Sequence, residues 1–346
     1  MLKAEGSNSV VTFAKRPAII AAAAITLAGI VASPVTSAYA ASQHPNTAAD
    51  PTVYMVGSVT NNTFWAAVQK GFLAGGAAFG LHTIYEAPGV HSSASAIPLI
   101  QAALAAKPAG IAINYTDKSL QNITLQALSQ GAKVVLYNNN LFQEFGGKPD
   151  TATTNPAITK LAYVGENSYD HAVTLANDLL PRLKAGTTVL IVDPVPGVEV
   201  LALRRQGLES VFNAHGIKTQ YLPAGLDETS NFTLIGSYLA AHPGIGGIVG
   251  LGDPTGDPAA EYVQQHHLNI PVGAFDVDSE AIHYIEAGVM TDATDQEPYL
   301  QGYLSAENLA FIIKDHLYPI TVNISDYVVD KANVADVAAA SAAGLD

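Results

Sequence analysis

From residue 52 onward, short apolar runs alternate with longer amphipathic ones. The short runs are apolar at nearly every position, which predicts strands covered on both faces, as in a parallel sheet. They span residues 52–59, 110–113, 133–137, 161–165, 187–192, 247–250, 272–275 and 289–293. The longer runs carry apolar residues at helical spacing, and Phe64, Val68 and Phe72 mark one such face. This alternation predicts an α/β protein with parallel sheets and right-handed crossovers.

Two successive blocks of the alternation predict two lobes. The stretch 297–324 holds one predicted helix, which is too little for a third domain, so we expect it to pack back on the first block. The predicted N-terminal lobe is therefore 51–165 plus 297–324, and the predicted C-terminal lobe is 166–296 plus 325–346. The alanine-rich tail from Ala332 to Asp346 is expected to be a frayed helix or a loose end.

The first forty residues have the pattern of a cleaved secretory signal peptide. Lys15 and Arg16 precede an apolar run over 18–32, and residues 38–40, Ala-Tyr-Ala, provide a small-x-small cleavage site. The alternative is an uncleaved anchor, but a membrane span needs about 20 apolar residues. Residues 41–50 are interpreted as a flexible linker. We expect a soluble protein exported to the periplasm or another extracytoplasmic space.

Composition and charge exclude several classes of protein. Hydrophobic residues make up 49% of the chain and charged residues 13%, which is typical of a folded globular protein. Thirty acidic residues against sixteen basic ones give a net charge of −14 without any basic block. Nucleic-acid binding needs clustered Lys and Arg, so that class is excluded. The absence of cysteine excludes disulfides, thiolate chemistry and an N-terminal lipid anchor.

The sequence lacks the motifs of common enzymes. It has no Gly-x-Ser-x-Gly, no phosphate-binding Gly-x-x-x-x-Gly-Lys-Ser/Thr and no His-Glu-x-x-His. The glycine-rich run 244–252 has no dinucleotide-binding register, and neighbouring His266 and His267 do not share a helix face. Strand-end aspartates remain as acid/base or metal candidates, namely Asp276 with Asp278 and Asp292 with Asp295. Such residues more often bind a ligand or cap a helix, so we predict no enzyme activity, cofactor or metal site.

Polar and aromatic residues gather instead where the predicted strands end. Ligands of open α/β sheets bind at the carboxyl ends of the strands. The candidates for ligand contact are Asn62, Phe64, Trp65, Tyr115, Asn138, Asn139, Arg204, Asp253, Asp276 and Gln296. Carboxylates, amides and guanidinium groups bind hydroxyls, and aromatic rings cover the apolar face of a sugar. The set predicts a small, uncharged, hydroxyl-rich ligand, because an anionic one would need more positive charge.

The chain resembles the periplasmic sugar-binding proteins of ABC importers, of the ribose/galactose-binding type, whose fold is shared by lac-repressor-type regulators. The resemblance covers Val53 to Val329 and rests on the order and spacing of six motifs. They are Asn-Asn-Thr-Phe-Trp (61–65), Ile-Asn-Tyr-Thr-Asp (113–117), Arg-Arg-Gln-Gly-Leu (204–208), Ala-His-Pro (241–243), Gly-Ala-Phe-Asp (273–276) and Asp-Gln-Glu-Pro (295–298). It implies the type I fold, in which two doubly wound parallel-sheet lobes joined by a multi-strand hinge close around a sugar.

The resemblance also implies roles for individual residues. Phe64 and Trp65 would sandwich the sugar ring, and Arg204, Asp276 and Gln296 would hydrogen-bond it. An arginine on the helix surface is the alternative for Arg204. If the guanidinium binds the ligand, its removal weakens binding by about 1.5–3 kcal/mol.

Two departures from the ribose type bear on the ligand. Asn138 and Asn139 stand where ribose-type members have Asp-Arg, and Gly252 and Asp253 stand where they have Asn-Asp. A charged pair has become an amide pair and one amide is missing. Ribose is therefore in doubt, and other pentoses, hexoses, polyols or a furanose-like signal molecule stay open.

The resemblance implies that a monomeric protein delivers its ligand unaltered to an ABC importer permease. Two alternatives stay open. The protein could present its ligand to a chemoreceptor or a sensor kinase, or it could be an exported carbohydrate-active enzyme that uses Asp276 or Asp292 as acid or base. A transcriptional regulator is set aside, because the export signal occupies the place of its DNA-binding domain.

Overall fold

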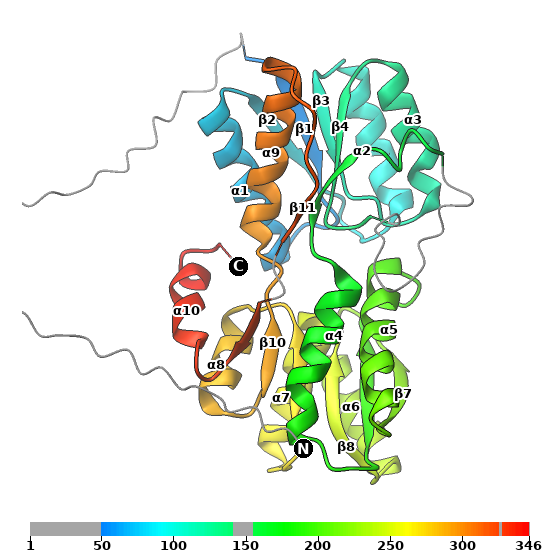
Figure 1. Cartoon of the computed structure of the whole chain (residues 1–346), viewed down its shortest axis with the longest axis vertical. Coiled ribbons are helices and arrows are strands. Elements are labelled where there is room, and N and C mark those ends of the chain that lie inside the picture. The colour runs from blue at the N-terminus through cyan, green and yellow to red at the C-terminus, as the bar shows by residue number, and fades with distance from the viewer. Residues whose placement is uncertain (1–49, 141–154, 325–326, 346) are drawn as a thin grey trace, which may run out of the picture. The chain divides into compact units, whose positions relative to one another are not determined.

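The computed structural model describes residues 50–140, 155–324 and 327–345, all of which lie in one compact unit. They form two six-stranded sheets with helices packed around them (Figure 1). The first sheet contains, in spatial order, β11 (Val322–Asn323), β5 (Ala162–Gly165), β4 (Lys133–Tyr137), β3 (Gly110–Ile113), β1 (Thr52–Val56) and β2 (His82–Glu86). The second contains β12 (Val328–Asp330), β10 (Asp292–Thr294), β9 (Val272–Phe275), β8 (Ile245–Gly250), β6 (Thr188–Asp193) and β7 (Lys218–Pro223).

The two sheets confirm the predicted fold class. Every strand pair of the first sheet is parallel, and so is every pair of the second except one. The exception is β12, which runs antiparallel to β10 at the edge of the second sheet. An antiparallel edge strand on a parallel sheet is common in α/β folds.

Four edge strands escaped the sequence pattern, the two- and three-residue β11 and β12 and the longer β2 and β7. β2 reads His-Thr-Ile-Tyr-Glu and β7 reads Lys-Thr-Gln-Tyr-Leu-Pro, and both are mostly half-buried. Each lies at the outer edge of its sheet, next to β1 and β6 respectively. A strand that is only partly covered can carry polar residues, so it lacks the continuous apolar run that marks a central strand.

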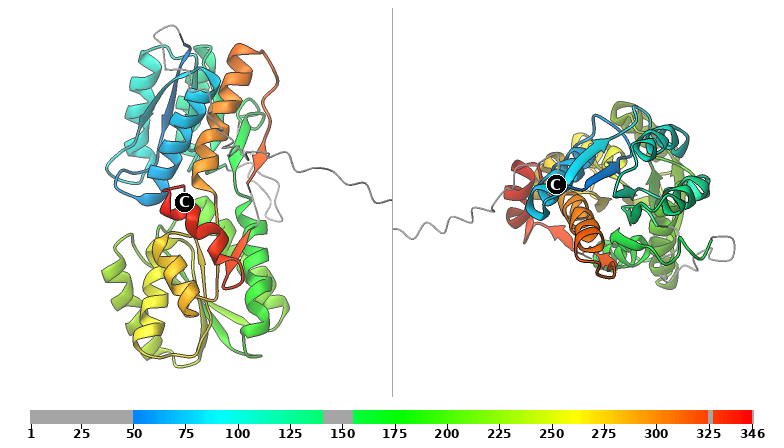
Figure 2. Two further views of the ribbon diagram at one scale, coloured as in Figure 1. Left: turned by 90° about the vertical axis from the view of Figure 1, so that its left-hand side faces the viewer. Right: turned by 90° about the horizontal axis from the view of Figure 1, so that it is seen from above.

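Four α-helices and a short 3₁₀ turn accompany the first sheet: α1 (Thr63–Phe79), α2 (Ser93–Ala105), η1 (Lys118–Leu120), α3 (Gln121–Ser129) and α9 (Pro298–Lys314). Helix α9, drawn in orange, lies alongside α1 (Figures 1 and 2). Glycines allow this close approach. A Cβ atom at Gly71 would lie 1.9 Å from the backbone oxygen of Tyr299, and one at Gly302 would lie 2.0 Å from that of Val68.

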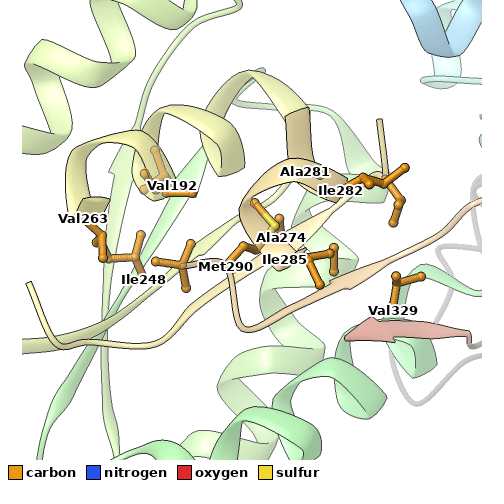
Figure 3. Packing of buried hydrophobic residues seen from close by; sticks show 14 of the residues in the cluster. Val192, Ile248, Val263, Ala274, Ala281, Ile282, Ile285, Met290 and Val329 are labelled. Carbon is orange, nitrogen blue, oxygen red and sulfur yellow. The ribbon is translucent and has the colours of Figure 1, made fainter. Parts of the chain in front are cut away.

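The second sheet is accompanied by α4 (Ser168–Leu179), η2 (Leu180–Arg182), α5 (Glu199–Ala214), α6 (Glu228–Ala241), α7 (Asp253–Gln265), α8 (Ser279–Ala287) and α10 (Val334–Ala342). Figure 3 shows part of one core, in which the strand residues Ile248 and Ala274 pack with Val263 of α7 and Ile285 of α8. Val334 and Val337 of α10 are buried against the same cluster. The tail is therefore a helix, as one of the two expectations had it, but it is packed and not frayed or loose, because it has an apolar face to bury.

Three chain segments connect the sheets, from β5 to α4, from β10 to α9 and from β11 to β12. The exact lobe boundaries stay a prediction. The predicted signal peptide and all of the linker except Asp50 lie outside the described residues. In the parts of the chain that the structure describes, none of the helices is long and apolar enough to span a bilayer.

Candidate ligand-binding site

A cavity of about 310 Å³ lies at the carboxyl ends of strands from both sheets. This volume is within the usual range for small-molecule sites, about 300–1,000 Å³. Nine of the ten residues that the sequence places at strand ends line it: Asn62, Phe64, Trp65, Asn138, Asn139, Arg204, Asp253, Asp276 and Gln296. The structure thus brings them together, and their contact with a ligand stays a prediction.

Tyr115 is the one candidate that does not line this cavity. Its side chain is fully buried in the hydrophobic cluster that contains Ile113 and Leu120. The placement of Tyr115 at the ligand is therefore corrected. A large ring beside apolar strand and helix residues is stabilised more by joining that core than by facing a polar cavity.

On the first-sheet side, Asn62 holds the start of α1. Its side-chain oxygen accepts from the backbone nitrogen of Trp65 at 3.2 Å, and its amide nitrogen lies 3.4 Å from an Asp253 carboxylate oxygen. Trp65 is buried and meets the rings of Phe64 and Tyr137 edge-on, at centroid distances of 5.1 and 6.3 Å. Phe64 is half-buried. The two consecutive aromatic residues therefore differ in burial: Trp65 is largely part of the core, and Phe64 is more exposed.

A chain of hydrogen-bonded side-chain amides includes the cavity-lining residues Asn138 and Asn139. The amide nitrogen of Asn139 donates to the side-chain oxygens of Asn114 at 2.7 Å and of Asn138 at 2.6 Å. Asn138 in turn donates to Gln301 of α9 at 3.1 Å, and Gln301 donates to the backbone oxygen of Gln296 at 2.9 Å. These bonds fix the orientation of the lining amides, and two of the partners, Asn114 and Gln301, are missing from the candidate set.

The second-sheet side presents two neighbouring carboxylates. Asp276 accepts from the side chain of Gln296 and from the backbone nitrogen of Asp253 at 3.3 Å. Burial raises the pKa of both aspartates, and their mutual repulsion raises that of Asp253 further. For Asp276 the raising effect of burial is only partly offset by Arg204. Two such carboxylates are acceptors for hydroxyl donors.

Unusual backbone conformations cluster at the cavity. Asn61, Asn138 and Asp276 line it and have φ angles of 61°, 56° and 77°. Glu297, which follows Gln296, has a φ angle of 50°. Non-glycine residues rarely adopt this left-handed region, and such strain concentrates at functional sites.

Arg204 is held in place by other protein groups. It is 3% exposed, and its Nε and Nη2 atoms lie 2.9 and 2.5 Å from Oε1 of Glu166. Its Nη1 donates to the backbone oxygen of Leu251 at 2.7 Å, and the guanidinium carbon lies 4.4 Å from the centre of the Phe275 ring. The structure excludes the alternative of a surface arginine.

Glu166 has two further partners. His171 Nδ1 lies 2.7 Å from its Oε2, and the Ser168 hydroxyl donates to its Oε1 at 2.8 Å. Burial alone raises the pKa of Glu166, but Arg204 and His171 outweigh that effect and lower it to about 2. Sequence reasoning missed Glu166 and His171, because a Glu and a His five residues apart at a helix start carry no distinctive pattern.

His91 is a further lining residue that the sequence did not reveal. Its Nδ1 lies 2.5 Å from the hydroxyl of Ser58, which follows β1. Burial lowers the pKa of His91, so the ring is neutral at physiological pH. It lies in the loop between β2 and α2, and the sequence pattern did not show the strand that positions this loop.

Of the aspartates considered as catalytic groups, only Asp276 lines the cavity. Asp278 caps α8 by accepting from two backbone nitrogens, each at 2.9 Å. Asp292 is fully buried in β10 and lies 3.3 Å from Arg182, and Asp295 accepts from the backbone nitrogen of Glu297 at 2.6 Å. Within residues 50–140, 155–324 and 327–345, no cluster of three or more His, Cys, Asp or Glu is arranged to hold a metal ion.

Comparison with known proteins adds independent findings. A sequence model of the periplasmic binding protein domain matches residues 53–316. The xylose/arabinose-binding protein XylF of Sulfolobus acidocaldarius is 22% identical over 82% of this chain and 71% of its own.

Among solved structures, a carbohydrate transporter of Acidothermus cellulolyticus in complex with myo-inositol is similar, with a TM-score of 0.73 and 26% identity over 86% of this chain and all of its own. A solute-binding protein of an ABC transporter from Agrobacterium vitis, bound to α-D-tagatopyranose, has a TM-score of 0.74 and 22% identity over 84% of this chain and 98% of its own.

Proposed function

Because the chain belongs to the periplasmic binding protein domain family, we propose that it captures a small neutral sugar or polyol and delivers it to the permease of an ABC importer. The observation that carries the proposal is the composition of the cavity. Aromatic rings and amides from the first sheet face carboxylates and a guanidinium from the second across about 310 Å³. A hydroxyl-rich ring needs both kinds of surface, apolar contact for its C–H face and polar groups for its hydroxyls.

The relatives support this ligand class. One is named for xylose and arabinose, one is complexed with myo-inositol and one is bound to tagatopyranose. All of these ligands are uncharged and carry several hydroxyls. Pentoses, hexoses and cyclic polyols are therefore the compounds to test first.

Capture would proceed by closure of two lobes about the segments that connect the sheets, a motion known for periplasmic binding proteins. A ligand favours the closed form only through contacts that it makes with both sides at once. Asn62 and Asp253, which approach to 3.4 Å from opposite sides of the cavity, already show that groups of the two sheets meet here. A sugar of about ten to twelve heavy atoms can reach micromolar affinity, about −8 kcal/mol, with such contacts.

Export and partners complete the proposal. The family acts outside the cytoplasm, and the N-terminal pattern of Lys15, Arg16 and the apolar run 18–32 supports export through a cleaved signal peptide. We propose that the mature protein works as a monomer, with an N-terminal lobe of 51–165 plus 297–324 and a C-terminal lobe of 166–296 plus 325–346.

A thermal-shift screen over pentoses, hexoses and polyols tests the proposal. A ligand at 100 times its Kd stabilises the folded protein by about 2.7 kcal/mol, which is a clear shift in Tm. Calorimetry on each hit gives the affinity, and mass spectrometry after incubation shows whether the compound returns unaltered. The absence of binding by any member would contradict sugar capture, and conversion of the hit to a product would support the enzyme alternative.

A further inference from the structure

The charged groups that line the cavity are unevenly divided by sign. Glu228, Asp253 and Asp276 contribute carboxylates, and Arg204 is the one Lys or Arg side chain among the described residues that line it. His91 is neutral at physiological pH because burial lowers its pKa. Whether the cavity accepts a negatively charged ligand therefore depends on whether the charge of Arg204 is available to that ligand.

The charge of Arg204 is already matched by Glu166. Two guanidinium nitrogens lie within 2.9 Å of a single carboxylate oxygen, and the pair is almost completely removed from solvent. An opposite charge at such a distance offsets part of the guanidinium field in the nearby cavity, although at Asp276 Arg204 still lowers the pKa by more than Glu166 raises it. Three of the five N–H groups are engaged with Glu166 and Leu251, which leaves two N–H groups to donate to a ligand.

Glu166 itself does not line the 310 Å³ cavity. It lies on the segment between β5 and α4 that connects the two sheets, and its second oxygen is held by His171 at 2.7 Å. Its carboxylate is thus fixed from both ends, by a histidine on α4 and an arginine on α5. Glu166 touches no ligand in the cavity and acts on it through Arg204, as a positioning residue.

We propose that Glu166 sets the charge selectivity of the site by neutralising Arg204 while holding its remaining donors toward the cavity. A neutral sugar then meets oriented hydrogen-bond donors and acceptors. The corresponding sugar acid meets three acidic side chains, which repel it when they are ionised, with no free positive charge to offset them, and it is rejected. This inference rests on the proposed function and narrows it to neutral sugars as opposed to uronates.

The test compares hexoses with the uronates that differ from them only by a carboxylate in place of the terminal CH₂OH. D-glucose is paired with D-glucuronate and D-galactose with D-galacturonate, and each Kd is measured by calorimetry at pH 7.5. Wild type is expected to bind a neutral member at least 100-fold more tightly than its acid. In Glu166→Gln the hydrogen-bonding shape is kept but the charge is lost, so this ratio is expected to fall at least tenfold.

A matched control comes from the next residue of the same helix. Arg205 pairs with Glu209 at 3.7 Å, and both are partly exposed and absent from the cavity lining. Glu209→Gln therefore removes one carboxylate beside one arginine without affecting the cavity, and its ratio is expected to equal that of wild type. A role of Glu166 in stability alone would lower the affinity for both members of a pair and leave the ratio unchanged.

A second probe, the small anion formate, serves if the cavity proves too small to bind hexoses. Formate is smaller than any sugar, and 50 mM sodium formate is expected to raise the Tm of Glu166→Gln relative to 50 mM sodium chloride, but not that of wild type or Glu209→Gln. If Glu166→Gln does not fold, as judged by circular dichroism, a wild-type ratio below tenfold still overturns the inference.

Three results would overturn the inference: wild type binding a uronate within tenfold of its neutral partner, an unchanged ratio in Glu166→Gln, or, where neither hexose binds, equal formate responses in all three proteins. A protein that binds no sugar or polyol would instead refute the proposed function, and the formate comparison would still report on the charge of Arg204.

Discussion

The two sides of the cavity differ in chemistry. The first-sheet side offers Phe64, Trp65 and a chain of amides, whose polar groups mostly bond to one another. The second-sheet side offers carboxylates and a buried arginine. The first side therefore provides shape and neutral hydrogen bonds, and the second provides charge. The charged side is therefore also the side whose buried acids lower stability, whereas the polar groups of the first side satisfy one another.

That instability has a physical origin in the clustered acids of the second side. Burial and the repulsion of neighbouring carboxylates raise the pKa of Asp253, and they raise the pKa of Asp257, which lies one turn further along α7 and does not line the cavity, to about 9. A carboxylate that is hard to ionise in the folded state opposes folding at neutral pH. Sites of this kind are retained for function although they lower stability.

The largest expected effect is that of Arg204→Ala. The change leaves the buried Glu166 carboxylate without its cation, and removing one partner of a buried ion pair typically lowers the free energy of unfolding by about 3–5 kcal/mol. Urea denaturation measures it. The double variant Glu166→Gln/Arg204→Met, which has no buried carboxylate at this position, is expected to be more stable than Arg204→Ala. Equal stability of the two would show that the ion pair is not the cause.

The second expected effect is a gain in the free energy of unfolding, where the first was a loss. Asp257 is 3% exposed and its Oδ1 has no hydrogen-bond partner among the described residues. Its pKa is raised from 3.8 to about 9, so its favourable contribution is complete below pH 3.8 and is lost as the pH rises toward 9. Asp257→Asn is expected to stabilise the protein by about 1–3 kcal/mol at pH 8 and by less at pH 5.

Denaturation curves at the two pH values measure this gain. Asp336→Asn, at an exposed position in the first turn of α10, is the control, with a change of a few tenths of a kcal/mol at most. A loss of stability in Asp257→Asn at pH 8 would contradict the assignment of an unfavourable buried acid.

On the first-sheet side of the cavity, Phe64→Ala is expected to weaken binding of the sugar found in the screen by about 0.5–1.5 kcal/mol, the range for an aromatic contact beyond simple burial. Its effect on Tm should be small, because the ring is only half-buried. Leu73→Ala is the control, since Leu73 lies on the same helix with 40% of its surface exposed and does not line the cavity. Unchanged affinity in Phe64→Ala would remove the ring from the site.

The smallest effect is the dependence of binding on pH. Ligand hydroxyls that donate to Asp253 and Asp276 need ionised carboxylates, and both have raised pKa values in the free protein. Protons must leave when the ligand binds, so affinity is expected to fall modestly, by roughly two- to fivefold in all, as the pH decreases from 8 to 5. Asp253→Asn should flatten this dependence. Affinity that rises on acidification would contradict it.

Much of the fold could be predicted from local patterns. The ranges 110–113, 133–137 and 272–275 coincide with β3, β4 and β9, because central parallel strands are buried on both faces and so are continuously apolar. Strand ends in such a sheet share one edge, and this rule gathered nine lining residues from positions far apart in the chain. Periodicity and topology were sufficient for both results.

The sequence by itself determined the α/β class, the central strands and the chemical nature of the cavity, because these depend on repeating burial patterns and on the edge at which parallel strands end. Only the tertiary structure decided that Tyr115 joins the core, that residues 334–342 pack as a helix, and that Arg204 is paired with Glu166. Each of these depends on which surface of a distant segment arrives beside a side chain, and a local pattern contains no information about that surface.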